Sequence, residues 1–229
     1  MQHQERLNYI HASAALVKLT KLLIHNTSRT SDYHSDRYLI SHPNKEQDRK
    51  ISSCILCVVS VMESQVDELQ PRAIANSLWA AAKLTAWLTP QQGLGREISV
   101  GYAGRNTGAD DAGKALQNRC LSLSLRLLNQ VPDAMLHFLP QHFSNTALAL
   151  TLLHNLVATT TELGPRRSLN KGDVEDAHLV TDSRLMYRLM DRSRPLLPQF
   201  EPQALANLMH SVASMGLRPN EGNEGILRL

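Results

Sequence analysis

Residues 69–84 read LQPRAIANSLWAAAKL, and residues 200–215 read FEPQALANLMHSVASM. When the two segments are aligned, Pro, Asn and three alanines coincide, and Ile/Leu and Leu/Met pairs occupy other shared positions. Pro71 and Pro202 suit the first turn of a helix, because the N–H that proline lacks would have no intrahelical partner there. Self-similarity of this kind is typical of proteins built from helical repeats.

Two weaker copies extend the pattern. Residues 143–153 keep the alternation of alanine with apolar residues, but they place Leu150 where Asn76 stands. Ser144 is expected to be the N-cap of this copy, because short hydroxyl side chains favour that position. Residues 12–22 form the fourth copy. We therefore expect four inner helices that are apolar nearly all round.

Amphipathic stretches precede the last three copies, at residues 50–68, 114–130 and 182–192. Each has an apolar stripe and a polar face, so the predicted unit is an outer amphipathic helix followed by an inner apolar helix. Stacked units of this kind form an all-α fold, an α-solenoid or α-α superhelix of helix pairs.

The predicted organisation alternates helices with polar segments. A first, partial repeat covers residues 1–25, and helix pairs cover residues 50–89, 114–160 and 178–219. Long polar inter-repeat loops, expected to be disordered, cover residues 26–49 and 90–113, a further loop covers 161–177, and a tail covers 220–229.

Composition limits the function classes. The formal net charge of +3 permits nucleic-acid binding but does not demand it. Three cysteines do not make a disulfide framework, and we expect Cys54 and Cys57, which lie in an apolar run, to be buried structural residues. No apolar stretch approaches the ~20 residues that cross a bilayer, so membrane insertion is not expected.

Motifs for catalysis are missing from the sequence. It contains no G-x-S-x-G, no Walker loop, no G-x-G-x-x-G and no H-E-x-x-H, and its histidines lack the spacing of metal ligands. We therefore predict no catalytic residue, no metal and no cofactor, and expect a protein that is not an enzyme.

The phrase at residues 71–84, with its second copy at residues 200–207, resembles the octotricopeptide repeat family of organelle proteins. Residues 8–22 are similar to repeats in relatives that carry a RAP domain. The resemblance implies an α-solenoid of the chloroplast or mitochondrion that binds a single-stranded transcript and controls its stability, processing or translation. The repeat-motif residues that carry it are Pro71, Asn76, Trp79, Pro202 and Asn207.

The sequence departs from that pattern in places. His210 stands where the first copy has Trp79, and no RAP domain is present. The N-terminal segment carries basic residues but matches the repeat, so we read it as mature structure and not as a clear transit peptide. Because the predicted array has an uncapped inner helix near each end, we expect the chain to be part of a longer protein.

Candidate RNA contacts lie on the polar faces of the outer helices. They are Arg119, Arg126 and Asn129 on one helix, and Arg184, Arg188 and Arg192 at i, i+4 and i+8 on the next. Arginines at steps of ~6 Å can follow a phosphate backbone. The alternative is an ordinary solvated face.

Polar and aromatic residues of the predicted inner helices can be interpreted either as RNA contacts or as parts of the fold. Amides such as Asn76 and Asn207 can pair with bases, but we expect them to bond backbone groups in the turn between helices. Trp79 and Trp87 can stack on bases, but we expect them to lie in the core.

Two function classes therefore remain open. One is an RNA-binding repeat protein, and the other is a HEAT- or armadillo-like scaffold whose groove holds a peptide or a helix of another protein.

Overall fold

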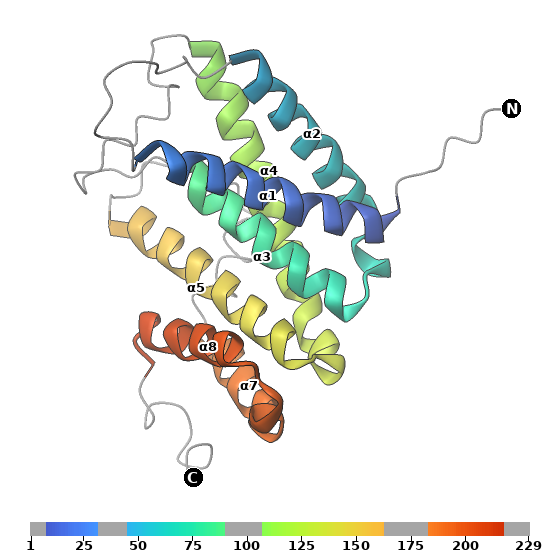
Figure 1. Ribbon diagram of the computed structural model, residues 1–229, viewed down its shortest axis with the longest axis vertical. Helices are drawn as coiled ribbons and strands as arrows, with labels where there is room; N and C mark the ends of the chain where they lie inside the picture. The colour runs from blue at the N-terminus through green and yellow to red at the C-terminus, as the bar shows by residue number, and fades with distance from the viewer. Residues whose placement is uncertain (1–7, 32–44, 90–106, 163–182, 218–229) are drawn as a thin grey trace, which may run out of the picture.

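The computed structural model describes residues 8–31, 45–89, 107–162 and 183–217, and every regular element within these ranges is helical. One layer, here called the inner layer, contains α1 (Tyr9–Ser31), α3 (Pro71–Leu88), α5 (Pro140–Glu162) and α8 (Pro202–Ser214), which follow one another along the long axis (Figure 1). The outer helices are α2 (Lys45–Ser64), α4 (Thr107–Ala134) and α7 (Ser183–Ser193). The predicted all-helical fold is confirmed, and its packing is consistent with a helical repeat.

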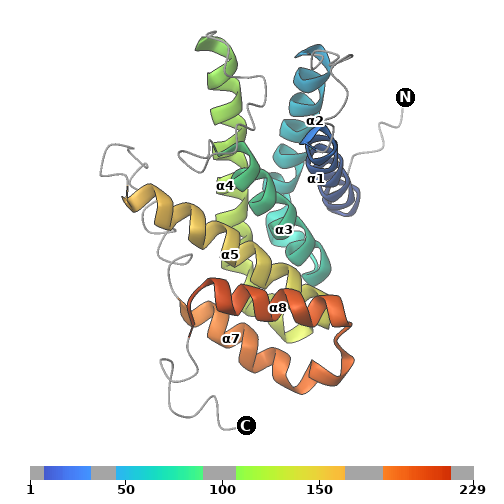
Figure 2. The same ribbon diagram turned by 60° about the vertical axis from the view of Figure 1, so that its left-hand side comes forward.

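Short 3-10 helices join each outer helix to the inner helix that follows it. They are η1 (Val66–Glu68), η2 (Met135–His137) and η3 (Arg194–Gln199). Neighbouring inner helices pack directly on one another, α1 on α3, α3 on α5 and α5 on α8. The second view shows α4 passing behind α3 and α5, and α7 below α8 (Figure 2).

The pairing of the layers differs from the predicted unit. The outer helix packs most closely on the inner helix that precedes it: α2 on α1, α4 on α3 and α7 on α5. We expected an outer helix to pair with the inner helix that follows. A short 3-10 link fixes only the adjoining ends of two helices, which then diverge, so adjacency along the chain does not decide which faces meet.

The three later inner helices share one start. Pro71, Pro140 and Pro202 are the first residues of α3, α5 and α8. Ser144 therefore lies inside α5 and is not its N-cap, and Asn145, not Leu150, is the counterpart of Asn76. Alternating alanines recur along α5 and do not fix a register, whereas the proline marks the helix start.

Several predicted loop residues are helical. Helix α1 continues to Ser31, α2 begins at Lys45 and α4 begins at Thr107, so residues 26–31, 45–49 and 107–113 belong to helices. Hydrophobic periodicity identifies only turns that carry an apolar stripe, and these segments are polar in sequence. Residues 161–162 of the third predicted loop likewise belong to α5, and the remaining loop residues and the tail at 220–229 lie outside the described residues.

The core is aliphatic and finely packed. Ala80, Ala81 and Ala82 have no solvent exposure, which allows the neighbouring helices to approach α3 closely. Trp79 packs against this core while partly exposed, in agreement with the expected core position, and Trp87 is also only partly exposed. None of the described helices combines the length and the apolar character needed to cross a bilayer.

Two of the cysteines do not lie where the sequence predicted. On α2 the buried stripe consists of Ile55, Val58, Val59 and Met62. Cys54 and Cys57 lie off this stripe and are exposed, so the prediction that they are buried is wrong. An apolar run on a surface helix buries only one side, and a three-residue step placed both thiols on the other. Cys120 is buried instead, and burial raises the pKa of its thiol to about 12.

Candidate partner-binding surface

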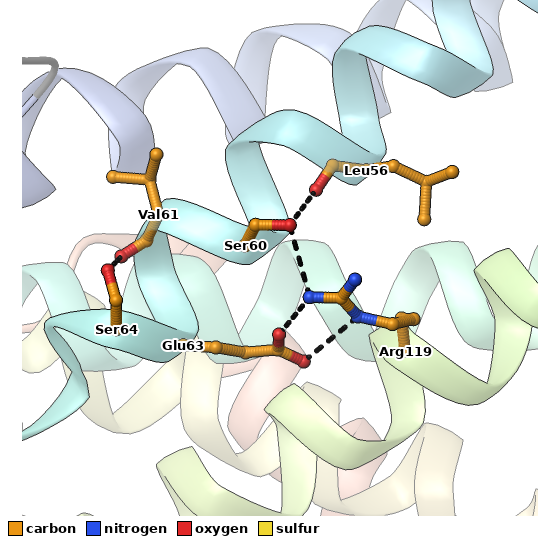
Figure 3. A network of polar contacts seen from close by, with 6 residues as sticks. All are labelled: Leu56, Ser60, Val61, Glu63, Ser64 and Arg119. Atoms are coloured by element: carbon orange, nitrogen blue, oxygen red, sulfur yellow. Dashed lines mark hydrogen bonds and ion pairs between the residues drawn. The ribbon is translucent and has the colours of Figure 1, made fainter.

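Arg119 is committed to a contact inside the protein. Its guanidinium forms an ion pair with Glu63 of α2, with Nε donating to Glu63 Oε1 at 3.4 Å and Nη2 bonded to Oε2 (Figure 3). Nη2 also donates to Ser60 Oγ at 3.1 Å, and that hydroxyl donates to the Leu56 carbonyl at 2.8 Å. Arg119 therefore joins α4 to α2 across the outer face.

The electrostatics agree with a structural role for Arg119. The hydrogen bond to Glu63 raises the pKa of the guanidinium, which stays charged in any case. Only 18% of the Glu63 side chain is exposed, so the carboxylate is partly shielded from water. A polyanion would have to displace this bidentate partner to use Arg119, so we separate it from the other candidate contacts.

Arg126 and Asn129 lie further along α4, and both are exposed. The neighbouring Gln130 donates from Nε2 to Asp67 Oδ1 of η1 at 3.3 Å, so this part of α4 is again joined to the preceding unit. Arg126 and Asn129 thus remain on the surface, whereas Arg119 is engaged with Glu63.

Helix α7 presents the arginine row as the sequence predicted. Leu185, Met186 and Leu189 are buried on one side of this helix. Arg184, Arg188 and Arg192 are exposed on the other. Because one turn of helix separates successive members, the row extends along the axis in steps of ~6 Å. Asp191 is exposed beside Arg192, so the row ends next to one negative charge.

A groove opens at the end of this row. It has a volume of about 410 Å³ and lies between the start of α5 and the end of α7. One wall contains Met135, Leu136 and Phe138, and the other contains Pro195 and Leu196. Asp191 and Arg192 also line the groove. The sequence did not predict this feature, since its two walls come from segments far apart in the chain.

The inner layer carries a row of amides. Asn145 Nδ2 of α5 donates to Asn76 Oδ1 of α3 at 2.9 Å, and Gln141 Nε2 donates to Asn145 Oδ1 at 2.8 Å. In α8, Gln203 Nε2 donates to Asn207 Oδ1 at 2.9 Å. The expectation that Asn76 and Asn207 bond backbone groups of a turn is not met, because both accept from side-chain amides.

The start of α5 is tightly organised. The backbone N–H of Leu139 donates to His142 Nδ1 at 3.1 Å, an N-terminal contact that satisfies a free donor of the helix. Phe138 packs edge-on against both His142 and Phe143, with ring centroids 5.6 Å and 5.3 Å apart. Burial lowers the pKa of His142, and the positive charge of Arg72 lowers it further.

Three partners in these contacts were missed from the sequence. Gln141 and Asn145 follow Pro140 at the spacing with which Gln203 and Asn207 follow Pro202, so the pattern Pro-Gln-x-x-x-Asn was a usable signal. Glu63 had no such signal, because it is 56 residues from Arg119 and no repeat relates the two.

Comparison with known proteins gives no match: no family model fits the chain, and no curated protein and no solved structure matches it.

Among the described residues, no group of three or more His, Cys, Asp or Glu side chains is arranged to hold a metal ion.

Proposed function

We propose that this protein is an organellar RNA-binding helical-repeat protein that forms an α-solenoid and controls a transcript by binding and not by catalysis. The observation that carries the proposal is the exposed row of Arg184, Arg188 and Arg192 on α7. The octotricopeptide resemblance supports the choice of single-stranded RNA in a chloroplast or mitochondrion, with a role in stability, processing or translation.

The arginine row on α7 is evenly spaced and held by a packed helix. The buried stripe of α7 fixes the helix against α5, so the arginines project from a framework that already has its final shape. Preorganised guanidinium groups bind phosphate with planar, paired hydrogen bonds. The row would hold the RNA backbone, while contacts to bases would come from other side chains.

A charge-reversal experiment tests this proposal. In the triple variant Arg184→Glu, Arg188→Glu and Arg192→Glu, we expect the affinity for a single-stranded RNA pool to fall at least about tenfold. The salt dependence, measured as the slope of log K against log salt, should become shallower by about 2, since each phosphate contact contributes about 0.7. Fluorescence anisotropy over a salt series, with circular dichroism to verify folding, gives both values.

The matched control carries the same change in net charge elsewhere. Lys18, Lys21 and Lys114 are exposed on α1 and α4, and their reversal to Glu should reduce affinity much less. Equal losses in both triple variants would mean that binding depends on net charge alone, and no loss in the α7 variant would remove the row from the binding surface.

The groove favours a second candidate function, a scaffold for protein segments. Six of its eight lining residues are apolar, and Leu136 at its edge is 64% exposed. A groove that combines apolar side chains with one acid and one base suits a short amphipathic peptide better than a polyanion. Retention of RNA at low salt that is lost in the α7 triple variant would favour the RNA function over this one.

A further inference from the structure

The two cysteines of α2 form a motif that neither proposed function uses. Cys54 and Cys57 were expected to be buried, and this expectation was the reason to regard them as structural residues. Both are exposed, whereas the third cysteine, Cys120, is buried in the core. Because a ligand must reach a thiol before it can bind there, only the two cysteines of α2 remain candidates for a binding site.

The two thiols lie on the same side of α2 and are here called the thiol pair. Residues three apart in a helix are neighbours on its surface, with Cβ atoms about 5–6 Å apart. The nearest exposed residues on this side, Ser53 and Ser60, have short side chains. No bulky exposed side chain of α2 therefore separates Cys54 from Cys57 or stands between them and solvent.

The helix next to the thiol pair is held in shape by several contacts. One turn after Cys57, Ser60 donates to the Leu56 carbonyl at 2.8 Å and accepts from Arg119 Nη2 at 3.1 Å (Figure 3). The ion pair of Arg119 with Glu63 joins the same part of α2 to α4. The buried stripe of α2 packs against the core on the opposite side. A reaction that distorts this part of the helix would have to break these contacts.

The spacing of the thiol pair favours an ion between the two sulfurs over a direct bond. A disulfide requires Cβ atoms about 3.5–4.5 Å apart, so closing one here would distort the helix. An ion bound to two thiolates at about 2.3 Å lets the sulfurs remain up to about 4.6 Å apart. Side chains on successive turns reach that separation by rotation about their own bonds, without a change in the backbone.

The number of available ligands selects the ion. Zinc in a structural site takes four ligands, and within the described ranges no third His, Cys, Asp or Glu side chain joins the thiol pair to form such a group. Thiolates select soft cations, and Cu(I) is satisfied by two of them in a near-linear arrangement. Two thiolates therefore suit Cu(I) better than Zn²⁺.

We propose that the thiol pair is a Cu(I)-binding site, in which the Sγ atoms of Cys54 and Cys57 hold one ion on the exposed side of α2. Binding forms two Cu–S bonds, releases two thiol protons to water and transfers no electron, so the bound group carries one net negative charge. Helix α2 lies at the opposite end of the molecule from α7 and its arginine row (Figure 1). The copper site does not depend on RNA binding, so each proposal can fail without the other.

Competition with a coloured chelator tests the proposal. The reduced full chain is titrated under nitrogen into the Cu(I) complex of bicinchoninate, and the loss of colour measures the transfer of copper. We expect one Cu(I) per chain. Cys54→Ser or Cys57→Ser should weaken binding at least about a hundredfold, because a single thiolate remains. The control Cys120→Ala should bind as the wild type does, since this thiol is buried.

A matched variant separates the spacing of the thiols from their number. When Cys54→Ser is combined with Ser64→Cys, α2 keeps two thiols at exposed positions, but they lie about 10.5 Å apart along the axis. This variant should bind Cu(I) as weakly as the single variants, with circular dichroism to verify folding. A wild type that takes no copper from the chelator, equal affinity in the matched variant, or tighter binding of Zn²⁺ than of Cu(I) would overturn the proposal.

Discussion

Helix α3 buries side chains on most of its surface, including Ala80, Ala81 and Ala82, whereas helix α7 buries one stripe and exposes Arg184, Arg188 and Arg192. Both belong to repeating helical units, but the inner helix is surrounded by α1, α4 and α5, while the outer helix has one main neighbour, α5. Helix α3 is therefore expected to contribute more to stability than α7, whose exposed side can vary in charge without loss of fold.

The largest expected effect is a cavity in the inner layer. Leu78→Ala should lower the free energy of unfolding by about 3 kcal/mol, because a fully buried leucine leaves a void that its rigid neighbours cannot fill. Arg188→Ala on α7 should change it by less than about 0.5 kcal/mol. Urea denaturation measures both values. Similar losses in the two variants would contradict this difference between α3 and α7.

A smaller effect is expected at the amide contact between α3 and α5. Asn76→Ala and Asn145→Ala should each lower the free energy of unfolding by about 1 kcal/mol, since each removes a partly buried hydrogen bond. The double variant should lose clearly less than the sum of the single changes, because one bond is shared. Additive losses in this double-mutant cycle would show that the two amides do not interact.

The smallest effect is a dependence of stability on pH at the start of α5. Folding lowers the pKa of His142 below its ordinary value of 6.5, mainly through burial, so the unfolded chain binds a proton more readily. The contribution of neutral His142 is complete above pH 6.5 and is lost as pH falls through the lowered pKa. His142→Gln keeps an acceptor for the Leu139 N–H and should be less sensitive between pH 8 and pH 5 in denaturation experiments. An unchanged pH profile would exclude this histidine as a source of the dependence.

The sequence predicted the kind of fold better than the arrangement of its parts. Pro71 and Pro202 mark helix starts by local chemistry alone, and both lie where expected. Pro140 carries the same signal, but the alternation of alanines after it suggests another register, so the match between Asn145 and Asn76 is visible only from the helix start. The choice of neighbours, such as α4 packing on α3 and not on α5, depends on the angles between helices, which no local pattern encodes.

For the candidate contact residues too, the sequence predicted positions along a helix but not the contacts between helices. The helical spacing of Arg184, Arg188 and Arg192 was sufficient to place all three on the exposed side of α7. Helical spacing also predicted Arg119 as an RNA contact. It did not predict the ion pair of Arg119 with Glu63, because an ion pair between distant segments depends on how two helices cross. The exposure of Cys54 and Cys57 shows a further limit, since the apolar character of a run does not indicate which of its residues face the core.

The inner helices differ in how much of their surface is buried, and this difference affects where local unfolding begins. Helix α8 is held to the inner layer chiefly by α5, and its buried residues are Ala204, Leu208 and Ser211, whereas the buried set of α3 is much larger. Local opening requires less free energy where fewer apolar contacts must break. We therefore expect fraying to begin at α8 and to reach α3 last.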